Sequence, residues 1–362
     1  MKVGFYLKEV NFRGIANSIY TFAKNNEKIL KNKSVIFYNS KSVENQIEAI
    51  RLFKKKFTVY KAHNFNELEK YYKKFNLDII YFQREGFKDY LVKNTKNVIH
   101  AIFPENMFGY HGFRYAYISK WLSKVSSNKK YPYVPLPVEL VDNKLNLRNK
   151  LNIPLNAKVI GYHGGNSSFD LQFVRDLIEE LVNKNNNIYF IFMNINKFIS
   201  HHKVIFLRGT FNPLKKVKFI NTCDAMLHAR SLGESFGISC AEFAIKNKLI
   251  FTYGFCRHRA HMDICANNIV PYFSYYDLKK KLIRFKKEKR VRNGIKKKFT
   301  EKKTIKIFEK VFLKSNYNPP KIKINDFIFV NIMMLTRNYF YVRHKIYTTW
   351  YKYISKPLRN IS

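Results

Sequence analysis

The sequence predicts an α/β protein of two domains, because strand-like and helix-like segments alternate along the chain. Strands that are joined through helices pair in parallel, so this alternation predicts parallel sheets covered by helices. The length of 362 residues exceeds that of a typical single core and suits two domains of similar size. Hydrophobic residues make up 46% of the chain and aromatic residues 17%, which is enough to fill two cores.

The first domain is predicted over residues 1–137. A first strand from Val3 to Leu7 is followed by Arg13-Gly14, which opens a helix, and this order is the beginning of a Rossmann-like unit. Further strand-like runs lie at residues 34–38, 57–60, 78–82 and 98–103. The last of these runs leads into a loop that carries His111. We therefore expect a doubly wound sheet in the first half of the chain.

A stiff, extended connector with Pro132, Pro135 and Pro137 marks the domain boundary. The second domain is predicted over residues 138–306, and its first strand runs directly into Gly164-Gly165. Two glycines between a strand and a helix form a candidate phosphate cradle, with a flexible turn as the alternative. The further strands are predicted at residues 188–193, 204–207, 224–228 and 249–253. Such apolar runs are typical of strands buried on both faces of a sheet.

The stretch HARSLGESFGISCAEF, from His228 to Phe243, reads as a polar loop that runs into a helix. The beginning of a helix presents unpaired backbone N–H groups and the positive end of the helix dipole, so it can hold a diphosphate. Glu234 lies in the loop, and Glu242 lies two turns into the helix with seven residues between them. One carboxylate can therefore face a ligand at the helix mouth while the other reaches along its flank.

With Ser-Phe-Gly after the first glutamate, this spacing resembles the E-x(7)-E motif of retaining nucleotide-sugar glycosyltransferases of the GT-B fold, the group 1 or family-four-like enzymes. The resemblance implies two Rossmann-like domains with a donor cleft between them and C-terminal helices that cross back to the first domain. It also implies transfer of a sugar from a nucleoside-diphosphate sugar to a hydroxyl of a glycan, lipid or protein-linked acceptor. Retention at the anomeric carbon, no bound metal and no cofactor are further expectations.

The resemblance implies roles for matching residues. Glu234 would contact hydroxyls of the donor sugar, and His111 would lie near the reacting carbon, so these two are the candidate catalytic residues. The implied donor-binding residues are Glu242, which would hold the ribose, with Ser235, Phe236, Gly237, Ile238, Gly164, Gly165, His163, Arg230, His228 and Gly14. The alternatives are an exposed helix position for Glu242, a turn-capping histidine for His111 and a plain turn for Gly14.

One departure from the family concerns the first strand of the second domain. Many members carry an arginine just after this strand and a lysine a few residues later, whereas this chain has Tyr162 and His163 there and no lysine. We therefore expect the cationic contacts to the diphosphate from Arg230, Arg208 or His163. The departure leaves a second hypothesis open, a non-catalytic GT-B-like scaffold at a membrane surface.

Charge and cysteine content give two further hypotheses. A formal net charge of +42 raises a nucleic-acid-binding protein as an alternative, which we consider less favoured because lysines are spread along the whole chain and the glutamates stay unexplained. Cys256, His258, His261 and Cys265 lie within ten residues, which leaves little chain to close a zinc tetrahedron. A loop at the rim of the donor site, with Arg257, His258 and Arg259 near phosphate, is the preferred interpretation.

The last segment, residues 307–362, is predicted as a helical, basic and aromatic tail. Its apolar run is interrupted by Asn331, Arg337 and Asn338, so we do not expect a membrane span. Helices that cross back to the first domain, a tail on an anionic membrane surface, or both, are the expectations. The cysteines lack a disulfide-like spacing, and residues 1–10 lack the apolar core of a signal peptide. We expect a cytoplasmic protein, with the cytoplasmic membrane face as a further location.

Overall fold

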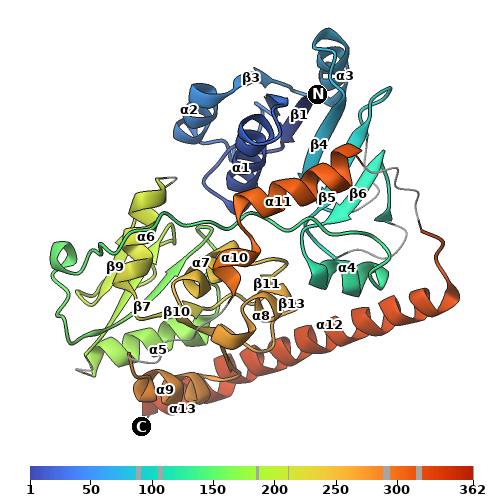
Figure 1. Ribbon diagram of the computed structural model, residues 1–362. Helices are drawn as coiled ribbons and strands as arrows, with labels where there is room; N and C mark the ends of the chain where they lie inside the picture. Colours follow the sequence, from blue (N-terminus) through green and yellow to red (C-terminus); the bar gives the residue numbers. More distant parts are fainter. Residues whose placement is uncertain are drawn as a thin grey trace. The chain divides into compact units, whose positions relative to one another are not determined.

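The structure, a computed structural model, describes residues 1–362 except 87–90, 105–108, 185–186, 211, 288–293, 315–319 and 362. The chain divides into two compact units (Figure 1). The N-terminal unit comprises Met1–Glu139 and Lys297–Met333, and the C-terminal unit comprises Leu140–Lys296 and Met334–Ser362. The segment predicted as a tail, 307–362, is thus shared between the two units.

A six-stranded parallel sheet forms the centre of the N-terminal unit, in the order β3-β2-β1-β4-β5-β6. Its strands are β1 (Lys2–Leu7), β2 (Lys33–Tyr38), β3 (Thr58–Lys61), β4 (Ile79–Arg84), β5 (Asn97–Ala101) and β6 (Arg114–Tyr117). The helices of this part of the chain are α1 (Gly14–Lys28), α2 (Ile47–Lys56), α3 (Phe65–Lys74) and α4 (Lys120–Ser127). The predicted α/β architecture with parallel pairing is confirmed, and β6 is a strand that the sequence reading did not identify.

The segment that returns to the N-terminal unit packs on this sheet through aromatic rings. It contains α11 (Glu301–Phe308), and the ring of Phe308 lies 5.2 Å from that of Tyr81 in β4. The backbone N–H of Val138 donates to the carbonyl of Phe299 at 2.8 Å, and Lys24 in α1 forms a 2.8 Å ion pair with Glu301. A late segment of the chain therefore completes the first unit, as the resemblance implied.

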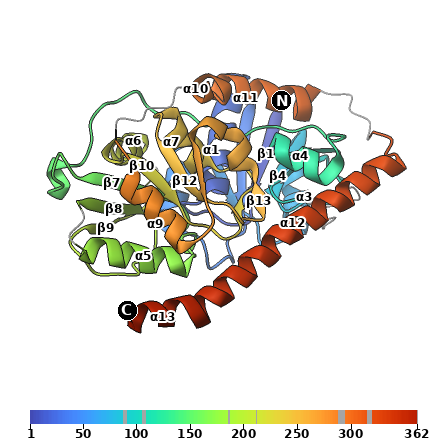
Figure 2. The ribbon, with the colours of Figure 1, turned by 90° about the horizontal axis from the view of Figure 1, so that it is seen from below.

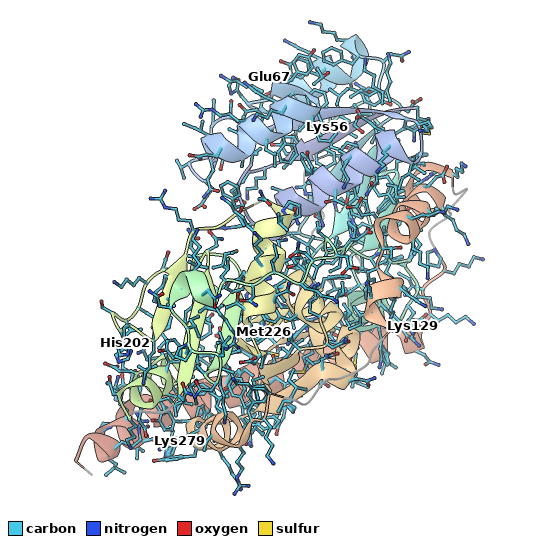
Figure 3. All side chains as sticks on the ribbon, turned by 60° about the vertical axis from the view of Figure 1, so that its left-hand side comes forward. Lys56, Glu67, Lys129, His202, Met226 and Lys279 are labelled. Carbon is cyan, nitrogen blue, oxygen red and sulfur yellow. The ribbon has the colours of Figure 1, made fainter. Side chains whose placement is uncertain are left out.

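A second six-stranded parallel sheet forms the centre of the C-terminal unit, in the order β14-β12-β10-β7-β8-β9. Its strands are β7 (Lys158–His163), β8 (Ile188–Met193), β9 (Val204–Leu207), β10 (Ala225–His228), β12 (Leu249–Tyr253) and β14 (Ile269–Tyr272). The helices are α5 (Gln172–Asn183), α6 (Pro213–Thr222), α7 (Ile238–Ile245), α8 (Ala260–Ile264) and α9 (Tyr275–Arg284). Met226 of β10 is fully buried between the layers, whereas Lys279 of α9 is half-buried and forms a 2.6 Å ion pair with Glu180 of α5 (Figure 3).

Further helices of the described residues lie late in the chain. They are α10 (Ile295–Lys298), α12 (Ile324–Trp350) and α13 (Lys356–Ile361). Within the described parts of the chain, no helix combines the length and the apolar character that a bilayer crossing requires.

Each sheet has a switch point, where the strand order reverses. Counted within its own unit, each sheet has the order 3-2-1-4-5-6, so the switch lies between β1 and β4 in one unit and between β7 and β10 in the other. In doubly wound sheets the ends of these strands form a crevice, and ligands bind there at the carboxyl ends. In the C-terminal unit the fold therefore predicts a ligand site at the loops after β7 and β10.

Candidate active site

Both loops that the sequence singled out leave the switch point of the C-terminal unit. β7 ends at His163, immediately before Gly164-Gly165, and β10 ends at His228, immediately before the loop with Glu234. Strands β7 and β10 are direct neighbours, with Ala225 opposite Ile160. The glycine pair and the glutamate motif, which lie about 70 residues apart in the sequence, therefore emerge from adjacent strands.

The loop around Glu234 contains a short strand, which corrects the prediction of an irregular polar loop. Gly233 and Glu234 form β11, which pairs in parallel with β13, His258–Arg259. Gly233 has φ +72°, and a Cβ there would collide with the carbonyl oxygen of His258. Gly237 has φ +88°, and a Cβ there would lie 2.7 Å from the Cβ of His261. Both glycines are required because the backbone is left-handed and closely packed on the next loop.

Glu234 is held by two basic side chains. Its Oε1 lies 2.9 Å from Nη1 of Arg230 and 3.4 Å from Nε2 of His228. Burial by itself would raise the pKa of this carboxyl group, but the charge of Arg230 and the hydrogen bond from His228 outweigh it and hold the pKa well below its ordinary value. Glu234 is therefore a carboxylate with a fixed orientation, suited to accept hydrogen bonds from hydroxyl groups of a ligand.

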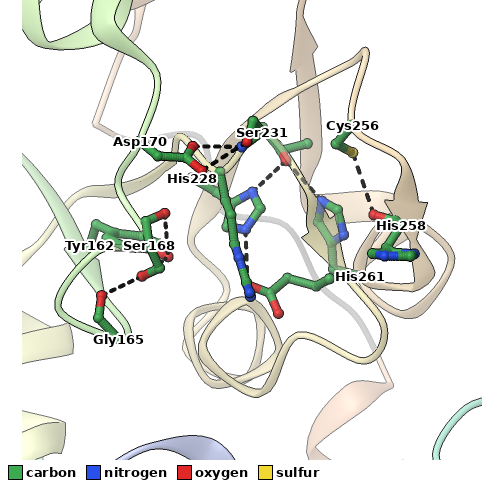
Figure 4. A network of polar contacts seen from close by, with 12 residues as sticks. Tyr162, Gly165, Ser168, Asp170, His228, Ser231, Cys256, His258 and His261 are labelled. Carbon is green, nitrogen blue, oxygen red and sulfur yellow. Dashed lines mark hydrogen bonds and ion pairs between the residues drawn. The ribbon is translucent and has the colours of Figure 1, made fainter. Parts of the chain in front are cut away.

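A buried chain of hydrogen bonds supports His228 (Figure 4). Nδ1 of His228 and Nε2 of His261 each lie 2.9 Å from the hydroxyl oxygen of Thr252, and all three residues are fully buried. Burial lowers the pKa of His261 well below its ordinary value, so that imidazole is neutral. If His261 donates to Thr252 and Thr252 donates to Nδ1 of His228, the N–H at Nε2 of His228 points to Glu234. These hydrogen bonds thus fix the ring of His228 and, through it, the orientation of the Glu234 carboxylate.

Glu242 lies on the buried side of α7, which shows that the alternative of an exposed helix position is wrong. Its Oε1 is 2.7 Å from Nζ of Lys216, and its Oε2 is 2.9 Å from Nε2 of His163. Only 4% of its side chain is exposed. Burial would raise the pKa, but Lys216 and His163 lower it to about 2. Glu242 is therefore ionised at neutral pH and lies next to two basic groups.

Lys216 is a site residue that sequence reasoning missed. It lies on α6, whose N-terminus is capped by the side chain of Asn212, and it reaches α7 from there. The sequence lacks the lysine that many enzymes of the resembled family carry after this strand, and Lys216 places an ammonium group beside Glu242 instead. Of the three cations predicted for a diphosphate, His163 and Arg230 each pair with one glutamate, and Arg208 is exposed beyond β9. No local pattern distinguishes Lys216 among the 67 lysines and arginines.

The loop after β7 is ordered by its own hydrogen bonds. The hydroxyl of Ser168 donates to the carbonyl of Gly165 at 2.7 Å and lies 3.0 Å from the hydroxyl of Tyr162. The side-chain amide of Asn194, just beyond β8, donates to the carbonyl of Gly164 at 2.7 Å. These contacts shape the loop into a defined turn at the end of β7, which suits a cradle for an anionic group.

The second half of the glutamate motif lines the beginning of α7. Phe236 is buried beneath the turn, Gly237 is the N-cap, and Ile238 is the first helical residue, while Ser235 is half-buried. Asp170, at the end of the loop after β7, accepts hydrogen bonds from both the backbone N–H and the hydroxyl of Ser231, at 2.7 and 2.8 Å. The two loops are thereby tied together.

In the loop after β12, one of the three residues predicted near phosphate differs from the expectation. His258 is buried, and this burial, together with Arg337 and Arg257, lowers its pKa to about 3, so it carries no positive charge for a phosphate. Arg259 donates to the carbonyl of Gly254 at 2.6 Å. His258 is therefore not a cation available to a phosphate, whereas the rim positions expected for Arg257 and Arg259 stay predictions. In the described part of the chain, no group of histidine, cysteine, aspartate or glutamate residues has the arrangement of a metal site.

Two predicted site residues lie in the N-terminal unit. Gly14 is the first residue of α1, just after the β1 strand and its loop. His111 is buried before β6, with its Nδ1 2.5 Å from the carbonyl oxygen of Gly109 and its ring 5.5 Å from that of Tyr115. This contact with its own loop gives His111 a defined ring orientation in that unit.

Comparisons with known proteins identify the fold. No protein-family model matches the sequence, and no curated protein matches it. Among solved structures, a glycosyltransferase from Rickettsia africae is similar with a TM-score of 0.62 and 12% identity, over 87% of this chain and 99% of that chain. HepE of Anabaena, in complex with UDP and glucose, has a TM-score of 0.61 and 12% identity, over 85% and 98%. S. aureus MnaA with UDP has a TM-score of 0.57 and 9% identity, over 89% and 100%. The chain has the GT-B fold.

Proposed function

We propose that this protein is a glycosyltransferase that moves a sugar from a nucleoside-diphosphate sugar to an acceptor hydroxyl. The observation that carries the proposal is the pair of carboxylates at the switch point of the C-terminal unit, the buried Glu242 and the half-buried Glu234, each held by basic side chains. Two structures of similar fold hold UDP, one of them together with glucose. This support makes a non-catalytic scaffold or a nucleic-acid-binding protein the less favoured explanation.

The donor would be bound by residues of the C-terminal unit. Glu242 would accept hydrogen bonds from the ribose hydroxyls, because carboxylate oxygens are acceptors that stay ionised next to Lys216 and His163. The diphosphate would lie on the N–H groups at the beginning of α7 and on the loop after β7, including Gly164 and Gly165. In this arrangement the ammonium group of Lys216 would supply positive charge near the leaving diphosphate, in place of the lysine that many enzymes of the resembled family carry after this strand.

Catalysis would rest on positioning and on stabilisation of the leaving group. Glu234 would hold hydroxyls of the donor sugar, and the buried chain through His228 would fix its orientation. Retention at the anomeric carbon and independence of a bound metal are part of the proposal. So are the contributions of His111 near the reacting carbon and of Gly14 near the donor phosphates, both from the N-terminal unit.

The first test is a thermal-shift screen with UDP, GDP and ADP and with their common sugar conjugates. One nucleotide class should raise the Tm by a few degrees, because a ligand that binds only the folded state stabilises it. Glu242→Ala should abolish the shift. The matched control is Glu179→Ala, which removes an exposed carboxylate from α5 in the same unit and should keep the full shift.

Product analysis completes the test. The donor class identified by the screen is incubated with acceptor hydroxyl compounds, and NMR follows the anomeric configuration of the transferred or hydrolysed sugar. Transfer with the donor's own configuration is the expected result. Binding of a nucleotide sugar without any cleavage would contradict the proposed enzyme, and no Tm shift with any nucleotide would contradict the proposed donor site.

A further inference from the structure

Helix α12 has two apolar faces along its second half, which belongs to the C-terminal unit. The inner face packs on that unit. The ring of Phe340 lies 4.2 Å from the guanidinium of Arg259, and the ring of His344 lies 5.6 Å from that of Tyr253. The hydroxyl of Tyr347 accepts the backbone N–H of Tyr275 at 2.7 Å. Residues 340, 344 and 347 are spaced by four and three, so they define one side of the helix.

The outer face carries a continuous stripe of large exposed side chains. We call it the outer stripe, and it consists of Leu335, Tyr339, Val342, Ile346 and Trp350. Each is at least 43% exposed, and Leu335 and Ile346 are each 63% exposed. At 100° per residue the centre of the stripe lies about 130° around the helix from the centre of the inner face, so the stripe points away from the packed side. A helix of a globular protein normally buries its apolar stripe, so this one is available to a partner.

Charge decides which partner fits the outer stripe. From Phe327 to the end of the chain there is no aspartate or glutamate, whereas the exposed cations Arg343 and Lys345 flank the stripe, and Lys352 follows it. A second copy of the same helix would bring like charges together with no acidic partner. An anionic surface would attract all three cations while apolar side chains enter the layer beneath its charged groups.

We propose that the outer stripe of α12 lies on an anionic phospholipid surface. Leu335, Val342 and Ile346 would enter the boundary between headgroups and acyl chains, and Tyr339 and Trp350 would lie at headgroup level, where aromatic rings with a polar atom are favoured. Arg343 and Lys345 would contact lipid phosphates from either side of the stripe. The helix lies along the surface, in the manner of an interfacial amphipathic helix.

The test is vesicle flotation of the full chain, with no nucleotide sugar present, so its outcome is independent of the proposed enzyme activity. Vesicles of phosphatidylcholine alone are compared with vesicles that contain roughly 30% phosphatidylglycerol. The anionic vesicles should bind the protein about 100-fold more strongly, because three cations near the surface each add to the attraction. Equal binding to both kinds of vesicle would overturn the charge argument.

Two variants with matched controls locate the contact. Ile346→Glu should weaken binding to anionic vesicles at least about tenfold, whereas Leu155→Glu, at a 79% exposed position in the same unit, should not. Arg343→Gln with Lys345→Gln should also weaken it at least about tenfold, unlike Lys54→Gln with Lys55→Gln at exposed positions of α2. Unchanged thermal unfolding shows that each variant is folded.

Two outcomes would overturn the proposal. Wild-type binding in all four variants would show that lipid contacts another surface. A concentration-dependent dimer in size-exclusion chromatography that Ile346→Glu abolishes, without vesicle binding by the wild type, would show that a second copy covers the stripe.

Discussion

The two units have sheets of the same strand order, but their switch points carry different side chains. In the N-terminal unit the buried polar groups at the carboxyl end of β4 include a hydroxyl and an amide, with Ser18 donating to Gln83 at 2.5 Å. In the C-terminal unit they include the carboxylates of Glu234 and Glu242, each with two basic partners. A shared topology therefore places a site, whereas the residues at the strand ends decide its charge.

From this difference we infer that the two units bind chemically different ligands. A diphosphate is bound by cations, and the hydroxyls of a ribose are bound by carboxylates. Among the described residues, both kinds of group lie at the switch point of the C-terminal unit. Nε2 of Gln83 is buried and has no hydrogen-bond partner among the residues that the structure describes. A neutral amide and a hydroxyl suit an uncharged hydroxyl compound better than a diphosphate. The predictions below test whether the C-terminal unit makes most of the donor contacts.

The largest effect is expected from Glu234→Gln. The substitution keeps the shape of the side chain but removes the charge that Arg230 and His228 orient. Turnover should fall about 100-fold or more, since oriented charge in a buried site contributes strongly to catalysis. Affinity for the nucleoside diphosphate, measured by calorimetry, should change less than about threefold because Glu234 is assigned to the sugar.

Glu179→Gln is the matched control for that substitution, because it makes the same chemical change at an exposed position of α5. It should leave turnover unchanged. Full turnover in Glu234→Gln, with correct folding shown by circular dichroism, would remove Glu234 from the proposed site.

A medium effect is expected in the pH dependence of stability. The pKa of Glu242 is lowered from 4.5 in the unfolded chain to about 2 in the fold, so its ionised form stabilises the folded state. This contribution is complete above pH 4.5 and is lost as the pH falls towards 2. The free energy of unfolding should therefore fall more steeply across this window in the wild type than in Glu242→Gln, as measured by urea titration at several pH values. Parallel curves would show that Glu242 is not stabilised by Lys216 and His163.

The smallest effect is expected from Gln83→Ala in the N-terminal unit. Loss of the hydrogen bond from Ser18 should cost about 1 kcal/mol of stability. The affinity for the nucleoside diphosphate should stay within about twofold of wild type, because donor contacts are assigned mainly to the other unit. A loss of nucleotide affinity as large as that of Glu242→Ala would contradict the division between the two switch points.

The sequence predicted the elements whose periodicity and boundaries are local. Strands at residues 188–193, 204–207 and 249–253 were predicted with the bounds that β8, β9 and β12 have, because each is a short and mainly apolar run. The short strand β11 was not predicted, because Gly233-Glu234 gives no alternating pattern and pairs only where β13 meets it. β6 has four residues that mix charge and aromatic rings, and it was likewise not recognised.

By itself, the sequence determined which loop and helix carry Glu234 and Glu242, since glycine positions and residue spacing act over a few residues. Only the tertiary structure decided their partners. Lys216 lies 26 residues from Glu242 in the chain, and Thr252 lies 24 residues from His228. Residues this far apart in the sequence meet because β7, β10 and β12 are arranged close together in the sheet. That strand order follows from the packing of the whole unit. A charge in the core needs a partner, but the sequence does not say which of its many lysines will provide it.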